Sequence, residues 1–124
     1  MGLAPLSARR LSALLLGFGA VYFAVHLWFV LSASFNVQGP DRVAFLDMAG
    51  ESIAYWSLFC LSGVVLGYFA VRYAALGLLA RCAVLLSSAG VGLAVALLAE
   101  WWASTYFLVP ALFLALAHRQ LAHA

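Results

Sequence analysis

Residues 11–34, LSALLLGFGAVYFAVHLWFVLSAS, form a run of 24 residues without a single Lys, Arg, Asp or Glu. At a rise of 1.5 Å per residue, about 20 apolar residues cross a hydrocarbon core of roughly 30 Å. The run is therefore long enough to span a membrane as one helix, with room for tilt. Arg9 and Arg10 directly precede it, and clustered Arg beside a first span tends to hold that end in the cytoplasm.

The composition of the whole chain is also that of a membrane protein. Of its 124 residues, 68% are hydrophobic and 8% are charged, whereas soluble domains have about 45–50% apolar and about 25% charged residues. No polar region is long enough for a separate globular domain, so we expect residues 1–124 to form a single transmembrane domain. All six basic residues are Arg and they form no tract, so a nucleic-acid partner is not expected. The absence of Lys beside abundant Ala, Leu and Arg is typical of GC-rich bacteria and favours a bacterial inner membrane.

Three further apolar runs follow at about residues 52–71, 79–98 and 101–117. Together with residues 11–34 they predict an all-α integral membrane protein, a bundle of four transmembrane helices. The fourth run is short and contains Pro110. Without Trp101 and Trp102 it comprises about residues 103–117, which cover only about 22 Å as a helix. Either Trp101 and Trp102 belong to that span or the bilayer is locally thinned around it.

The first loop, residues 35–51, is the only sizeable polar interval. Gly39 and Pro40 predict a turn, and Asp41 can cap a short helix whose apolar residues recur at i, i+3 spacing. Gly50 is expected to end this helix. The loop is therefore predicted to hold a short helix lying along the membrane interface.

Charge favours one orientation of the four spans. With the N-terminus inside, the cytoplasmic side receives five of the six basic residues: Arg9, Arg10, Arg72, Arg81 and Arg119. The outer side receives Arg42 alone. Because cytoplasmic loops carry an excess of basic residues, this distribution predicts an N-in, C-in topology.

Small residues on two spans are candidates for helix packing. The second span contains Gly63 and Gly67 in a G-x-x-x-G pattern, and the third places Ser88, Gly92 and Ala96 on one stripe. Such stripes let helix backbones approach closely, which is a main source of helix association in lipid. We expect these stripes either to pack spans two and three together or to form a face for self-association.

His26 is the one titratable residue well inside a predicted span, about 12 Å below its outer end. It is either a polar group hydrogen-bonded to Ser or Tyr on a neighbouring span or a proton-relay group. His118 and His123 lie in the tail at the opposite side, so one chain cannot supply two histidine ligands to a haem. Their spacing of five places them on different helical faces, and neither a metal site nor a cofactor is expected.

Glu100 lies at the turn between the third and fourth spans and is the second candidate residue. Its simplest interpretation is a hydrated loop acid, which can equally pair with Arg42. The alternative is an acidic, aromatic outer mouth that attracts cations through carboxylates and ring faces. The other residues of this predicted mouth are Asp47, Glu51, Trp56, Trp101 and Trp102.

No nucleophile elbow, phosphate-binding loop or H-E-x-x-H motif is present, so an enzyme is not expected. The favoured hypothesis is a small accessory subunit, or an immunity-type protein that blocks a toxin, acting through helix–helix contacts with a larger membrane protein. The second hypothesis is a homo-oligomeric transporter or channel for protons, cations or small amphipathic solutes. A redox subunit would need part of its cofactor site from another chain.

Overall fold

The computed structural model describes residues 5–122, and over that range the chain is helical, without strands. His123 lies outside the described residues. The elements are α1 (Pro5–Asn36), α2 (Pro40–Val71), the 3₁₀ turn η1 (Tyr73–Ala75), α3 (Leu78–Leu98), the 3₁₀ turn η2 (Trp101–Ser104) and α4 (Thr105–Ala122). Four segments in this range are long and apolar enough to cross a bilayer, which makes the chain a multi-pass membrane protein.

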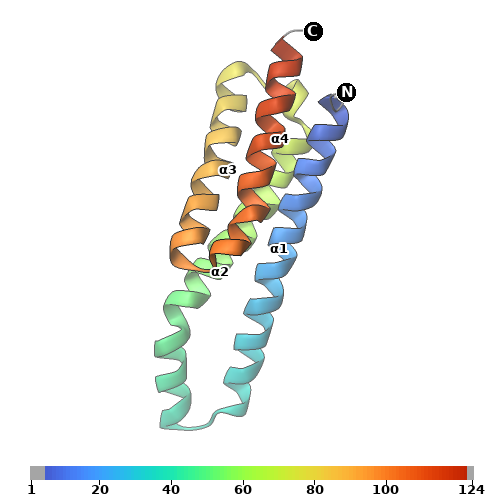
Figure 1. Cartoon of the computed structure of the whole chain (residues 1–124). Helices are drawn as coiled ribbons and strands as arrows, with labels where there is room; N and C mark the ends of the chain where they lie inside the picture. The colour runs from blue at the N-terminus through green and yellow to red at the C-terminus, as the bar shows by residue number, and fades with distance from the viewer. Residues whose placement is uncertain (1–4, 123–124) are drawn as a thin grey trace.

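The four helices have unequal lengths. α1 and α2, of 32 residues each, form a long antiparallel hairpin, whereas α3 and α4 have 21 and 18 residues. Figure 1 shows that α3 and α4 cover only the half of this hairpin near the chain ends, and that the α1–α2 turn extends well beyond them. We call the end with the chain termini the basic end, because it carries Arg9, Arg10, Arg72, Arg81 and Arg119. The opposite end is the hairpin end.

The separate interfacial helix predicted for the first loop is not observed. The turn does fall at Gly39 and Pro40: Gly39 has φ of 65°, and its carbonyl accepts the Arg42 N–H at 3.1 Å. From Pro40 the chain then continues as one helix to Val71, straight through Gly50. An interior glycine costs about 1 kcal/mol relative to alanine, which a long helix packed against a neighbour tolerates. Asp41 lies in the first turn, but no side chain caps this helix.

The fourth span includes both tryptophans that the sequence left undecided. Trp101 and Trp102 form the 3₁₀ turn η2, which leads directly into α4, and the apolar span reaches from Trp101 to Leu121. Pro110 lies inside α4 and is buried. The span is thus longer than the predicted residues 101–117.

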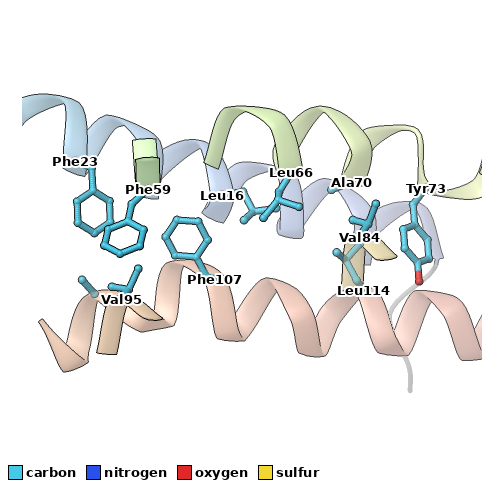
Figure 2. Packing of buried hydrophobic residues seen from close by; sticks show 11 residues of the cluster. Leu16, Phe23, Phe59, Leu66, Ala70, Tyr73, Val84, Val95, Phe107 and Leu114 are labelled. Atoms are coloured by element: carbon cyan, nitrogen blue, oxygen red, sulfur yellow. The ribbon is translucent and has the colours of Figure 1, made fainter. Parts of the chain in front are cut away.

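The core is an apolar column along the bundle axis (Figure 2). Phe23, Phe59 and Phe107 form the part of the column nearest the hairpin end. The ring centroids of Phe23 and Phe59 are 5.3 Å apart, and those of Phe23 and Phe107 are 6.4 Å apart. Leu16, Leu66, Val84 and Leu114 are among the side chains that fill the middle, and the buried Tyr73 closes the column at the basic end. Because this column is closely filled, it fixes the positions of the helices around it.

The small-residue stripes do not pack spans two and three together, so that expectation was wrong about the partners. A Cβ at Gly63 would lie 2.8 Å from the Leu16 carbonyl oxygen, so the G-x-x-x-G of α2 faces α1. A Cβ at Gly92 would lie 2.6 Å from the Leu108 side chain, so the stripe of α3 faces α4. Between α2 and α3 lies instead an open groove of about 350 Å³. It is lined by Leu61, Ser62, Val65, Leu66, Ser87 and Val91.

Two buried serines tie the other helices to α4. Ser88 of α3 donates to the Phe107 carbonyl at 2.7 Å. The Ser12 hydroxyl of α1 lies between two carbonyls, that of Ala8 on its own helix at 2.9 Å and that of Pro110 on α4 at 3.2 Å. Serine is short enough to place its hydroxyl against a neighbouring backbone, which is a common way to join membrane helices. Ser88 therefore belongs to the α3–α4 contact together with Gly92.

Candidate functional site

The two sequence candidates, His26 and Glu100, lie on either side of one residue that the sequence analysis did not select, Tyr22. The Tyr22 hydroxyl donates to Glu100 Oε2 at 2.9 Å, which joins α1 to the turn between α3 and α4. The carbonyl of the same tyrosine lies 2.8 Å from His26 Nδ1. Tyr22 and His26 share one face of α1 because they are four residues apart. That spacing, next to an intramembrane histidine, is the sequence signal that could have indicated Tyr22.

Aromatic rings surround the Tyr22–Glu100 hydrogen bond. Tyr22 contacts the rings of His26, Trp102 and Tyr106 at centroid distances of 4.2, 5.0 and 5.6 Å. On the other side of His26 lies Trp56 of α2, with the ring centroids 5.6 Å apart. We call these six residues, Tyr22, His26, Trp56, Glu100, Trp102 and Tyr106, the Glu100 site.

Local structure explains why these groups meet. Gly19 leaves the space that Tyr106 occupies, because a Cβ there would lie 2.7 Å from the Tyr106 Cβ. The η2 turn is held by the Ala103 N–H, which donates to the Glu100 carbonyl at 3.0 Å, and by the Thr105 hydroxyl, which donates to the Trp102 carbonyl at 2.8 Å. Glu100 and Trp102 are thereby positioned against the same segment of α1.

His26 is hydrogen-bonded, but to its own helix rather than to a side chain of a neighbouring span. A contact with a carbonyl oxygen requires a proton on Nδ1, so this nitrogen is the donor. Among residues 5–122, no group forms a hydrogen bond with Nε2. Neutral His26 therefore keeps a free acceptor nitrogen beside Trp56.

Glu100 itself is exposed and lies between two candidate spans, Leu78–Leu98 and Trp101–Leu121. Its carboxylate is fixed on one side by the Tyr22 hydroxyl of α1. A carboxylate at the end of a span costs less than one at the bilayer centre, because water can reach it.

The predicted outer mouth forms only in part. Trp56 and Trp102 join Glu100, but Trp101 is 77% exposed and points away from the core. Glu51 accepts the Tyr55 hydroxyl on its own helix at 3.1 Å, and Asp47 is exposed nearer the α1–α2 turn. Arg42 pairs with neither acid, because its guanidinium lies over the Phe35 ring at 5.2 Å. The acids are therefore spread along the hairpin rather than gathered in one mouth.

A second polar cluster closes the basic end. Arg81 donates to the carbonyls of Tyr73 and Ala74 at 3.1 and 2.8 Å, which caps the η1 turn. The Tyr73 hydroxyl lies 3.4 Å from His118 Nδ1 on α4. Burial raises the pKa of the Tyr73 phenol above its usual value, and the positive charge of Arg81 opposes the shift. These contacts hold the ends of three helices together and give this cluster a structural role.

Comparison with known proteins adds no relative: no family model, no curated protein and no solved structure matches this chain.

Proposed function

We propose that this chain is a small non-enzymatic subunit of a bacterial inner-membrane complex, which binds a larger membrane protein through the α1–α2 hairpin. An immunity-type protein that blocks a toxin within the membrane would use the same surface. The observation that carries the proposal is the apolar surface of the hairpin beyond Glu51, on a part of α1 and α2 that α3 and α4 leave uncovered.

The length of α2 and the position of its charges support placing this surface outside the hydrocarbon core. α2 begins at Pro40, about 16 Å beyond Glu51, while the charge-free part on the other side of Glu51 already spans the core. Apolar side chains beyond Glu51 remain exposed: Phe35 by 71%, Val43 by 61% and Met48 by 84%. Together with Leu46 they form what we call the hairpin surface. Apolar groups gathered outside the bilayer core are typical of protein contact sites.

Charge at the hairpin end narrows the class of partner. Asp41, Asp47 and Glu51 lie on this part of α2, and Arg42, the one basic residue there, lies over Phe35. A partner surface that combines apolar side chains with basic ones would complement it, because opposite charges steer association and suppress wrong partners.

The proposed orientation is N-in and C-in, which is supported by the five Arg residues at the basic end. The hairpin surface would then lie on the outer side of the inner membrane, together with all four acids. The partner would accordingly be contacted at the outer membrane surface and along the uncovered part of α1.

Site-specific photocrosslinking in the native membrane tests the proposal. A photoreactive amino acid at Met48 or Phe35 should produce an adduct of one discrete mass, the same from both positions, which mass spectrometry of the purified adduct then identifies. The matched control is Leu79 of α3, which is 86% exposed but lies at the basic end. It should not form that adduct. Adducts with lipid or with a second copy of the chain alone, at all three positions, would contradict the proposal.

A second candidate function is a homo-oligomeric transporter of protons, cations or small amphipathic solutes. The observation that favours it is that Glu100 and His26 both contact Tyr22, Glu100 through the phenol and His26 through the backbone carbonyl. Within residues 5–122 the interior of one chain offers no polar path, because the column from Phe23 to Leu114 is apolar. The buried hydroxyls of Ser12 and Ser88 beside this column are occupied by backbone carbonyls. A path would therefore have to run between copies. His26→Ala should abolish such transport while insertion is retained, and normal transport by this variant would exclude His26 from it.

A further inference from the structure

The groove between α2 and α3 lies on a face of α2 that carries an arginine nearer the basic end. Leu61 and Val65 line the groove, and Tyr68 and Arg72 follow Val65 at spacings of three and four residues, which keeps them on its face. The Arg72 N–H still donates to the Tyr68 carbonyl at 3.3 Å, and its guanidinium lies over the Tyr68 ring at 5.2 Å. Arg72 is exposed, and among residues 5–122 no carboxylate pairs with it. An uncompensated positive charge therefore lies in line with the groove.

The walls of the groove suit an apolar occupant. Apart from two serines its lining is aliphatic, and the Ser62 hydroxyl is occupied because it donates to the Leu58 carbonyl of its own helix at 2.8 Å. On α3, the residues one and two turns from Ser87 toward the basic end are Ala83 and Ala80, both exposed. These small side chains keep the α3 wall low from the groove to the basic end, where η1 joins the two helices (Figure 1).

From this arrangement we infer that the groove holds an acyl chain of an anionic phospholipid whose phosphate binds Arg72. The depth of the groove supports this occupant. Its α2 lining extends from Leu66 to Leu61, about 9 Å to about 16 Å from Arg72 along the helix. One leaflet of a hydrocarbon core of roughly 30 Å is about 15 Å deep. A lipid with its headgroup at Arg72 therefore has its acyl chain at the depth of the groove.

Charge selects the headgroup. The basic end carries five arginines, and the four acids of the chain lie toward the hairpin end of the bundle. On α3 the guanidinium of Arg81 is occupied by the carbonyls of Tyr73 and Ala74, which leaves Arg72 as the arginine of this helix pair that can bind a phosphate. Basic groups at the membrane surface attract anionic lipids. This inference goes beyond the proposed function, because it concerns a lipid and not the hairpin surface.

The test uses the full chain purified in a neutral maltoside detergent and titrated with phospholipids in native mass spectrometry. Phosphatidylglycerol should bind as one discrete adduct, about fivefold more tightly than phosphatidylcholine with identical oleoyl chains, which has a phosphate but no net charge. Glycerol phosphate, which supplies the anionic group without acyl chains, should not displace the lipid. Equal affinities for the two lipids, or displacement by glycerol phosphate, would overturn the inference.

A charge variant tests the headgroup contact. Arg72→Gln should weaken binding of phosphatidylglycerol about fivefold, which corresponds to about 1 kcal/mol for one basic residue beside anionic lipid. Binding of phosphatidylcholine should change less. The matched control is Arg10→Gln, which removes an exposed arginine at the same end of the bundle but on α1, and it should leave the affinity unchanged. An equal loss in both variants would indicate a general attraction between charges and would contradict a site at Arg72.

Variants that fill the groove test the acyl-chain contact. Ser87→Phe narrows the groove from the α3 wall and leaves Arg72 in place, so it should weaken binding of both lipids. Ser62→Phe does the same from the α2 wall, which keeps the test decisive if one of the two variants fails to fold. Circular dichroism verifies that each variant is folded. Unchanged lipid affinity in a folded groove variant would overturn the inference.

Photocrosslinking in the native membrane then separates a lipid from a protein helix as the occupant. A photoreactive amino acid at Ser87 should yield adducts with phospholipid. A discrete adduct with another protein at this position would assign the groove to a partner helix and overturn the inference. The crosslinks from Met48 and Phe35 are independent of this result, so either proposal can fail while the other stands.

Discussion

Gly63 lies so close to Leu16 that a methyl group added at the glycine would sit 2.8 Å from the Leu16 carbonyl oxygen. The neighbouring atoms are backbone and the Cβ of Ala20, at 3.0 Å, so no flexible side chain can move aside. The approach of α2 to α1 therefore depends on the missing side chain at this position, and it sets the register of the long hairpin.

Gly63→Ala should consequently lower the free energy of unfolding by about 1–3 kcal/mol, because α1 and α2 must separate to accept the methyl group. Unfolding by sodium dodecyl sulfate in mixed micelles, followed by circular dichroism, measures the change. The control is Gly67→Ala, whose Cβ would meet its nearest atoms at an ordinary 3.7 Å and should be tolerated. Equal destabilisation by both substitutions would show that the packing at Gly63 is not the cause.

The serine contacts with α4 give a second prediction. Ser88→Ala removes the buried hydrogen bond to the Phe107 carbonyl and should cost about 0.6 kcal/mol, the average for such bonds between membrane helices, and at most about 1.7 kcal/mol. Ser62→Ala should be neutral in the same assay, because the Ser62 hydroxyl donates only within its own helix, to Leu58. A neutral Ser88→Ala would mean that the bond does not contribute to holding α3 on α4.

Tyr22 and Glu100 should behave as one unit. Tyr22→Phe and Glu100→Gln each disturb the hydrogen bond between α1 and the η2 turn, so the double variant should be less destabilised than the two single effects added together. We expect a coupling energy of about 0.5–1.5 kcal/mol from unfolding in mixed micelles. The matched pair Tyr55 and Glu51 lies four residues apart on one helix, so its double-variant cycle should show a smaller coupling of about 0.2–0.5 kcal/mol. Additive effects at Tyr22 and Glu100 would contradict this role.

Cysteine labelling tests the proposed orientation. In a background where Cys60 and Cys82 are replaced by Ala, Met48→Cys should react with a membrane-impermeant maleimide in spheroplasts. Ala75→Cys, exposed in the η1 turn at the basic end, should react only after the membrane is opened. The reverse pattern would establish the opposite topology and would place the hairpin surface in the cytoplasm.

The first loop shows where sequence reasoning worked and where it failed. Gly39 and Pro40 do form the turn, because a positive φ favours glycine and proline suits the first turn of a helix. Gly50 does not end a helix, although glycine is common just after the last turn of one. Here residues 51–71 continue the helix and pack on α1, and this tertiary contact outweighs the local preference.

Four of the six residues of the Glu100 site were named from the sequence: His26, Glu100, Trp56 and Trp102. His26 and Glu100 could be selected because ionisable residues near or inside apolar spans are rare and conspicuous. Tyr22 was missed, since a tyrosine is common in membrane helices and its spacing of four from His26 is a weak signal without the contact with Glu100. Tyr106 was missed for the same reason, although Gly19 marks the gap into which it packs.

The sequence by itself determined the class of the protein: four apolar helices, the turns between them and the concentration of Arg at one end. These properties depend on composition within single segments, and a helix must satisfy its own backbone in lipid wherever its neighbours lie. Only the tertiary structure decided which helix faces which, how far the α1–α2 hairpin extends beyond α3 and α4, and that Tyr22 joins His26 to Glu100. In a membrane protein the lipid-facing and core-facing surfaces are both apolar, so the hydrophobic pattern does not specify rotation or register. Small residues and a few hydrogen bonds specify them, and these act only through their partners in space.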